Sequence, residues 1–267
     1  MKGTIRTGIG GWVFDPWRET FYPPGMKPKE HLRHAASVLS AIEINATFYR
    51  TQTADIFRGW AAEVPDGFRF AVKAARGAAQ RKDAAEAKPA IERFLQSGLS
   101  ELGDRLGPIL WQLPAGRTFD ADQLSAFLDL LPERLDGTKL RHALEAQHPS
   151  FLDPAALALL GARNVALVGL DKQGVETRTP ITADFVYLRL QGTQSGERFG
   201  YPAKALALWV ERLDALSRGI VPDAIAVPDA PPVRPGAREV FAFVIAGAKE
   251  TAPAAAMELA RIAAATR

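Results

Sequence analysis

Cysteine is absent from all 267 residues. This absence excludes disulfides, thiolate nucleophiles, iron–sulfur clusters and cysteine-type zinc sites. The opening residues, Met1-Lys2-Gly3-Thr4, are not followed by the basic and then apolar pattern of a leader, and no apolar run reaches the roughly 20 residues that cross a bilayer. We therefore expect a soluble, cytoplasmic protein without a membrane partner.

Basic residues exceed acidic residues only slightly. The chain has 33 basic and 30 acidic residues, a net charge of +3 and a pI of about 9.2. This balance permits an anionic ligand without requiring one. The densest basic cluster, which is Lys73, Arg76, Arg81 and Lys82, is short for a dedicated nucleic-acid binder. Nucleic acid is therefore a possible partner that the composition does not favour, and the oligomeric state is not indicated.

What is present is a regular alternation of strands and helices. Eight apolar runs predict strands at Thr4–Gly11, Ala41–Asn45, Phe68–Lys73, Pro108–Gln112, Lys139–Ala146, Asn164–Leu170, Asp184–Gln191 and Glu239–Ala246. Helical spacing follows at Pro28–Leu39, Ala54–Glu63, Ala85–Leu102, Ala121–Leu131, Pro154–Leu160, Ala203–Leu216 and Ala252–Ala265. Only the sixth connection, Asp171–Ala183, lacks a convincing helix.

This alternation predicts a parallel sheet, because parallel neighbours need a crossover connection. Eight units in about 250 residues match a closed (β/α)₈ TIM-type barrel that forms one domain over residues 1–267. An open doubly wound sheet is the alternative. Against it, Gly8-Ile9-Gly10-Gly11 does not continue as GxGxxG into a helix. A proline-rich irregular loop is expected at Pro222–Arg238.

Polar side chains share one parity on several predicted strands. Glu43 and Asn45 alternate with Ile42 and Ile44. The same alternation recurs on four further predicted strands, where the polar parity holds Arg69 and Lys73; Gln112; Arg141 and Glu145; and Tyr187, Arg189 and Gln191. Trp111 and His142 take the opposite, helix-facing parity. Because alternate side chains point to opposite faces, we expect the polar set inside the barrel, with its last members at the carboxyl end. A purely structural network is the alternative reading.

Several stretches resemble one known family. These are Gly8–Trp12 with Trp17-Arg18 and Phe21–Pro23, Glu43–Tyr49, Phe68–Lys73, Gln112–Pro114 and Glu145–Ser150. Over most of its length the chain is similar to the YecE-like family, also called domain of unknown function 72. The resemblance implies a TIM-type barrel and no particular activity. Gln147, Gln191 and Ala246–Lys249 depart from the usual pattern of that family.

Glu43 and Glu145 are candidate catalytic groups, because two carboxyls in unequal environments can act as acid and base. A glycosidase would need them about 5 to 10 Å apart. Lys73 is a further catalytic candidate, either as a Schiff-base nucleophile or as a counter-ion. Ion pairing of each glutamate with Arg189, Lys73 or Arg69 is the structural alternative.

No metal is predicted from histidine, since there are only four. His31 and His34 are expected to be solvated in the first helix, and only His148 is placed to reach the barrel mouth. An oxygen-rich Mg²⁺ or Mn²⁺ site from Glu43, Glu145 and Asp171 stays open. No other cofactor is predicted.

Ligand contacts are expected around the same end of the barrel. The aromatic loop after the first strand could form a lid that stacks on a sugar or base, or it could plug the mouth as core. Lys249 precedes a helix with Thr251 as its predicted cap, which could hold a phosphate or be a plain cap. The ligand-binding candidates are Trp12, Trp17, Arg18, Asn45, Tyr49, Gln112, His148, Arg189, Gln191 and Lys249.

These observations favour an enzyme whose active site lies at the carboxyl ends of the barrel strands. We expect acid/base chemistry on a small anionic or phosphorylated ligand that resembles a carbohydrate or nucleotide. Hydrolase and isomerase or lyase chemistry stay equally open. The rival is a non-catalytic binding module for nucleic acid or nucleotide, built on the aromatic loop and the basic rim.

Overall fold

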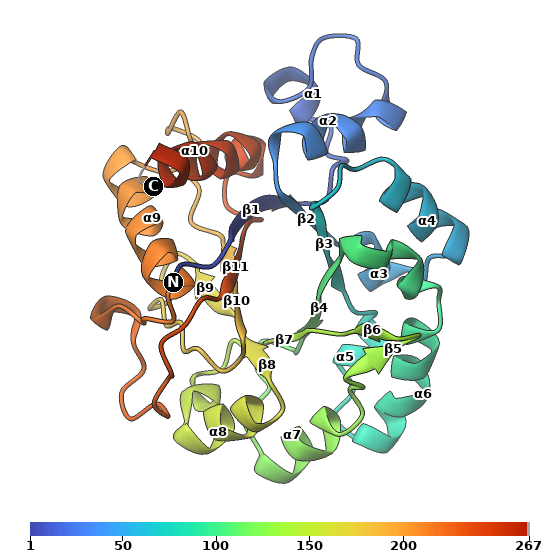
Figure 1. Ribbon diagram of the computed structural model, residues 1–267, viewed down its shortest axis with the longest axis vertical. Helices are drawn as coiled ribbons and strands as arrows, with labels where there is room; N and C mark the ends of the chain where they lie inside the picture. The colour runs from blue at the N-terminus through green and yellow to red at the C-terminus, as the bar shows by residue number, and fades with distance from the viewer. Residues whose placement is uncertain (266–267) are drawn as a thin grey trace.

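The parallel sheet closes into a barrel surrounded by helices. A computed structural model describes residues 1–265, and Figure 1 shows the ring of strands with the helices outside it. The sheet order is β8-β7-β4-β3-β2-β1-β11-β10-β9, and every neighbouring pair is parallel. The predicted (β/α)₈ barrel is therefore confirmed.

The strands of this sheet are short and regularly spaced along the chain. They are β1 (Ile5–Gly10), β2 (Ala41–Ile44), β3 (Arg69–Lys73), β4 (Leu106–Gln112), β7 (His142–Glu145), β8 (Val165–Leu167), β9 (Gly169–Asp171), β10 (Phe185–Leu190) and β11 (Glu239–Val244). The helices are α1 (Trp17–Thr20), α2 (His31–Val38), α3 (Ala46–Tyr49), α4 (Ala54–Ala62), α5 (Arg76–Ala79), α6 (Ala84–Leu95), α7 (Ala121–Leu128), α8 (Pro154–Ala162), α9 (Ala203–Ser217) and α10 (Ala252–Ala265).

The sixth strand of the barrel is broken in two. The sequence predicts one strand there, and the structure has β8 and β9 on either side of Val168. β8 pairs with β7 and β9 pairs with β10, so the two halves together close the ring. The backbone N–H of Val168 still donates to Leu144 at 2.9 Å, and therefore the break leaves no gap in the ladder.

Two apolar layers confirm the predicted parity. Ile42, Ile44 and the other helix-facing strand residues belong to the large outer core between sheet and helices. Ala71, Leu110, Ala143, Tyr187, Phe241 and Phe243 belong to a separate cluster that fills the barrel interior. Since successive residues of a strand face opposite sides, the polar residues of the second parity point into the barrel.

Two local predictions were wrong at glycines. The helix predicted over Ala85–Leu102 ends at Leu95, because Gly98 has φ 99° and the chain resumes as a 3-10 helix over Leu99–Arg105. The strand predicted to start at Lys139 is interrupted by a hairpin, β5 (Arg134–Leu135) and β6 (Thr138–Lys139). Its turn is Asp136-Gly137, and both residues have positive φ, as Asp-Gly hairpin turns require.

The sixth crossover has no helix, as the sequence predicts. Residues 172–184 run from β9 to β10 as turns and extended chain. The proline-rich segment 222–238 lies against this connection, and the N–H of Thr179 donates to Ile225 at 2.9 Å. Two irregular segments thus occupy the position of one helix in the outer layer. Within residues 1–265, no helix is both long and apolar enough to traverse a bilayer.

Candidate functional site at the carboxyl end of the barrel

One arginine stands between two glutamates inside the barrel. Arg189 on β10 donates to both oxygens of Glu43 on β2, at 3.1 Å from Nε and 3.0 Å from Nη2. Its Nη1 donates to Glu145 at the end of β7. Glu43 and Glu145 are 0 % exposed and Arg189 is 5 % exposed. Three strands that are distant in sequence therefore meet in one buried ion cluster.

Every oxygen of the two carboxylates accepts a hydrogen bond. The hydroxyl of Tyr187 donates to Glu43 at 2.7 Å, beside the guanidinium. The amides of Gln112 and Gln147 both donate to the second oxygen of Glu145, at 2.8 and 2.9 Å. Buried charges are tolerated when they are paired and their remaining lone pairs are satisfied, and this cluster meets both conditions.

The charges in the cluster stabilise one another. Burial alone would raise the pKa of Glu145, but the Arg189 charge and the amide hydrogen bonds outweigh it and hold that pKa below its ordinary value. Burial opposes the charge of Arg189, yet the two glutamates raise its pKa further. Burial and the Glu43 charge raise the pKa of the Tyr187 phenol. Arg189 and Glu145 are therefore ionised near neutral pH.

This geometry does not favour Glu43 and Glu145 as a direct acid/base pair. The guanidinium occupies the space between the carboxylates where a scissile bond would lie, and all four oxygens already have donors. The pair instead fixes Arg189, as the structural alternative anticipated. Its direct acid/base role stays a prediction.

Lys73 differs from the paired charges of the ion cluster beside it. It is the last residue of β3 and is 7 % exposed. Within the described residues its ammonium has neither an ion pair nor a hydrogen bond, and its Nζ lies 4.1 Å from the ring centroid of Phe48. Burial and then the Arg189 charge lower its pKa, and the glutamates oppose this. Lys73 is thus a desolvated cation without a partner.

The expected Mg²⁺ or Mn²⁺ ligand set does not assemble. Arg189 already fills the position between Glu43 and Glu145, while Asp171 accepts a hydrogen bond from Tyr201 at 2.7 Å. In the part of the chain that the structure describes, no three His, Asp or Glu side chains are grouped to hold a metal ion. The donor set at this site therefore fits a guanidinium and not a divalent cation.

The aromatic loop is mostly core. Trp17 is fully buried and donates from its indole N–H to the carbonyl of Lys249 at 2.9 Å, so it offers no face to a ligand and its predicted binding role is corrected. Trp12 is partly buried and packs edge-on against Trp60 at 5.2 Å. Arg18 lies outside, paired with Asp15 at 3.4 Å. The loop is thus part of the outer core between the sheet and the helices.

The ammonium of Lys249 lies over the rings of Phe14 and Trp17 in the same aromatic loop. Its Nζ lies 4.5 Å from the ring of Phe14, and burial lowers its pKa. The Thr251 hydroxyl donates to the carbonyl of Ala248 at 2.8 Å. Lys249 is therefore a cation held by aromatic faces beside α10.

Other predicted residues serve local structure. Asn45 donates to the carbonyl of Glu43, and His148 accepts from the N–H of Ser150 and so caps a 3-10 helix over Pro149–Leu152. Gln191 follows β10, and its N–H donates to Asp171. His31 is buried and stacks on Tyr22 at 3.8 Å, so the prediction that it is solvated was wrong.

The sequence did not predict a cationic pocket that lies near Lys73 and Phe48. It has a volume of about 320 Å³ and lies next to the carboxyl ends of β2 and β3. Arg50, Arg76 and Arg93 line it, and within residues 1–265 none of the three has an ion pair. Tyr49, one of the predicted ligand-binding residues, lines it with 82 % of its surface exposed. Because α5, α6 and the end of α3 bring these arginines together, strand periodicity gave no signal for them.

The protein is thus a (β/α)₈ barrel. At the carboxyl end of its strands it has a buried ion cluster and a lysine without an acid partner. The chain belongs to the family described as "Protein of unknown function DUF72", whose model matches residues 6–267. The YecE-like resemblance of the sequence is thereby confirmed.

Known structures share the whole fold. A DUF72 family protein from Thermotoga maritima is 20% identical, with a TM-score of 0.73 over 97% of this chain and 98% of that chain. One from Enterococcus faecalis is 17% identical, with a TM-score of 0.71 over 98% and 96% of the two chains. At such identities the likeness establishes the fold alone.

A shorter match joins the chain to the UPF0759 protein YunF of Bacillus subtilis. It is 33% identical over 73 residues, which is 27% of this chain and 25% of that protein. The match thus spans about a quarter of the length of this relative.

Proposed function

We propose that the protein is an enzyme that binds a small anionic or phosphorylated ligand, carbohydrate-like or nucleotide-like, at the carboxyl end of the barrel. The observation that carries the proposal is Lys73, a buried lysine whose ammonium lies against the Phe48 ring and, among the described residues, has neither an ion pair nor a hydrogen bond. A desolvated cation costs free energy unless an anion compensates it. An anionic oxygen of the ligand supplies that compensation.

Lys73 also provides the acid/base group of the proposed reaction. A lysine whose pKa burial lowers exchanges its proton closer to neutral pH than an exposed lysine does. Glu43 and Glu145 act as positioning residues, because they hold Arg189 in one orientation beside the lysine. Arg189 in turn opposes the positive charge of Lys73 and favours its neutral form.

The test compares Lys73→Met with Lys29→Met, an exposed lysine in the 3-10 helix Pro28–Glu30 before α2. Calorimetric titration uses inorganic phosphate, glucose 6-phosphate and AMP as probes, and phosphorus NMR follows their conversion. We expect Lys73→Met to weaken binding of at least one probe about tenfold or more, equivalent to about 1.4 kcal/mol, and to abolish any conversion. Wild-type affinity in Lys73→Met for every probe that binds, or no binding by the wild type, would contradict the proposal.

The arginine pocket supports a second candidate, binding of a single-stranded polynucleotide without catalysis. Three guanidiniums without acid partners suit phosphates, and the exposed ring of Tyr49 suits stacking on a base. Such binding weakens steeply with salt because phosphate contacts release counterions.

Variants of the pocket arginines distinguish polynucleotide binding from the proposed enzyme activity. Fluorescence anisotropy with an oligothymidylate of about ten nucleotides, a length near the site size of small single-strand binders, is measured against salt. Arg76→Gln and Arg93→Gln are each expected to reduce the logarithmic salt slope by about one, whereas Lys73→Met leaves it unchanged. Unchanged slopes in both arginine variants would reject the second candidate.

A further inference from the structure

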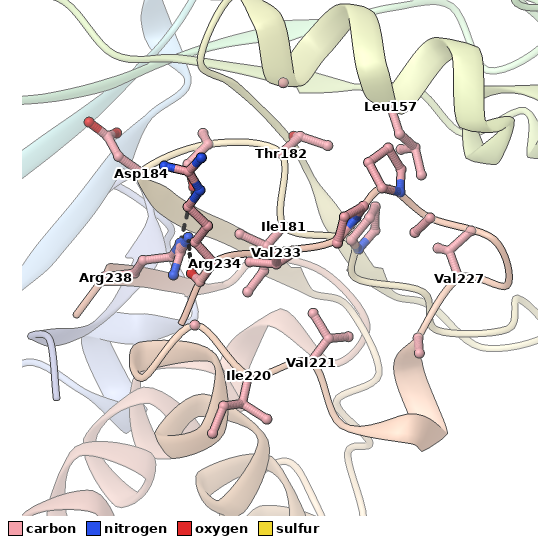
Figure 2. Close-up of a pocket in the computed structure, with 18 of the residues that line it drawn as sticks. Leu157, Ile181, Thr182, Asp184, Ile220, Val221, Val227, Val233, Arg234 and Arg238 are labelled. Atoms are coloured by element: carbon pink, nitrogen blue, oxygen red, sulfur yellow. Dashed lines mark hydrogen bonds between the residues drawn. The ribbon is translucent and has the colours of Figure 1, made fainter. Parts of the chain in front are cut away.

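A large open cavity lies away from the barrel mouth, where the sixth helix is missing. It measures about 980 Å³ and is lined by α8, by residues 180–184 and by segments 219–221 and 226–238 (Figure 2). Arg178 donates to the carbonyl of Ala226 at 2.6 Å, so the two irregular segments are tied together. A helix at this position would have filled the space that they leave open.

One end of the cavity is apolar. Figure 2 shows Leu157 and Val227 at the end far from the arginines, with Ile220, Val221 and Val233 along the wall between. Ile220 is 51 % exposed in this open space. An aliphatic side chain gains roughly 25 cal/mol for each square ångström that a ligand removes from water. This end therefore favours a hydrocarbon or aromatic body.

The other end carries two arginines without acid partners. Arg238 donates to the backbone carbonyls of Ala183, Gly236 and Arg234, at 3.3, 3.2 and 2.9 Å. Among residues 1–265, neither Arg234 nor Arg238 has a carboxylate partner. The neighbouring Asp184 is taken by Lys139 at 3.1 Å. Burial lowers the pKa of Arg238, and the charge of Asp184 opposes this only in part.

We propose that this cavity binds an amphipathic monocarboxylate, with its carboxylate at Arg234 and Arg238 and its apolar body toward Leu157 and Val227. The cavity volume falls within the range of about 300 to 1,000 Å³ that is usual for small-molecule sites. A planar guanidinium matches a carboxylate through two parallel hydrogen bonds. Asp184 at the same end disfavours ligands with a larger negative charge, such as phosphate esters.

The apolar end is tested by blocking it. Ala158 is exposed and lines the cavity, while Ala155 lies on the same helix outside it. Calorimetric titration with decanoate, below its micelle concentration, is expected to lose at least tenfold affinity in Ala158→Trp and none in Ala155→Trp. Equal affinities in these two variants, or no binding of decanoate to the wild type, would overturn the proposal.

The charged end is tested with the ligand and with the protein. Decanol, which lacks the charge, is expected to bind at least tenfold more weakly than decanoate. Arg234→Gln should remove most of that difference, whereas Arg33→Gln, an exposed arginine elsewhere, should retain it. Decanol and decanoate binding alike would refute a carboxylate site. Decyl phosphate binding more tightly than decanoate would refute the assignment to a monocarboxylate.

Discussion

The two ends of the barrel carry ion clusters of opposite composition. At the carboxyl end one arginine, Arg189, stands between Glu43 and Glu145. At the amino end one glutamate, Glu239, stands between Arg6 and Arg141. The two clusters also differ in exposure. The side chains at the carboxyl end are at most 6 % exposed, whereas those around Glu239 are 13 to 21 % exposed.

This difference indicates what each cluster does. The charge of the amino-end cluster is moderated by water, and Arg141 also lies over the ring of Phe241 at 4.9 Å. The carboxyl-end cluster has little solvent contact and depends on complete pairing. Beside it lies the unpaired Lys73. In the proposed function the carboxyl-end cluster supports Lys73, whereas the more exposed cluster at the amino end ties strand ends together.

Removal of the central arginine has the largest expected effect. Arg189→Met leaves two buried carboxylates without a counter-charge and should lower the free energy of unfolding by about 3–5 kcal/mol. Urea denaturation at neutral pH measures this loss. In the Arg189→Met background, Glu145→Gln should restore part of the stability, although the same change destabilises the wild type. A loss below about 1 kcal/mol would mean that water enters the cluster.

Removal of the central glutamate at the other end has a smaller expected effect. Glu239→Gln removes the ion-pair partner of Arg6 and Arg141, but both arginines stay in partial contact with water. We expect a loss of about 1–2 kcal/mol in the same denaturation experiment. Added sulfate should restore more stability to this variant than to Arg189→Met. A loss equal to that of Arg189→Met would remove the distinction between the two ends.

Acid should weaken the carboxyl end through Glu145. Its pKa in the folded state lies below the ordinary value of 4.5, so the unfolded state binds a proton first as the pH falls. The stabilisation is complete above that value and is lost as the pH drops through the folded pKa. Glu145→Gln should therefore flatten the acid limb of stability against pH, by at most about 1.4 kcal/mol per pH unit. Glu19→Gln, at the exposed surface, is the control, and equal slopes would contradict this expectation.

Strand periodicity was sufficient to predict the inward-facing set. Glu43, Lys73, Glu145 and Arg189 each lie on the polar parity of a strand, and all four lie within the barrel as predicted. A period of two fixes the face of a strand whatever its neighbours are. The alternation cannot show which side chains meet, so it did not indicate that Arg189 would occupy the space between the two glutamates.

Features that depend on loops were missed for a related reason. The helical spacing of His31 does not reveal that Tyr22 covers it, and the aromatic loop does not reveal that Trp17 is fully buried. The arginine pocket combines residues from α5, α6 and the end of α3. Contacts between distant segments follow from the packing of the whole chain, whereas periodicity reports only the nearest neighbours.

The smallest expected effect has the opposite sign and separates Lys73 from both clusters. Lys73→Met removes a buried charge that lacks a partner, so it should raise the free energy of unfolding at neutral pH by about 1 kcal/mol. Burial lowers the folded-state pKa of Lys73 from 10.5, and the wild type therefore gains stability as the pH rises from that folded pKa toward 10.5. The advantage of Lys73→Met should shrink over this range, whereas Lys29→Met should follow the wild type. If Lys73→Met destabilises the protein as paired residues do, Lys73 belongs to the ion cluster and is not the free cation of a binding site.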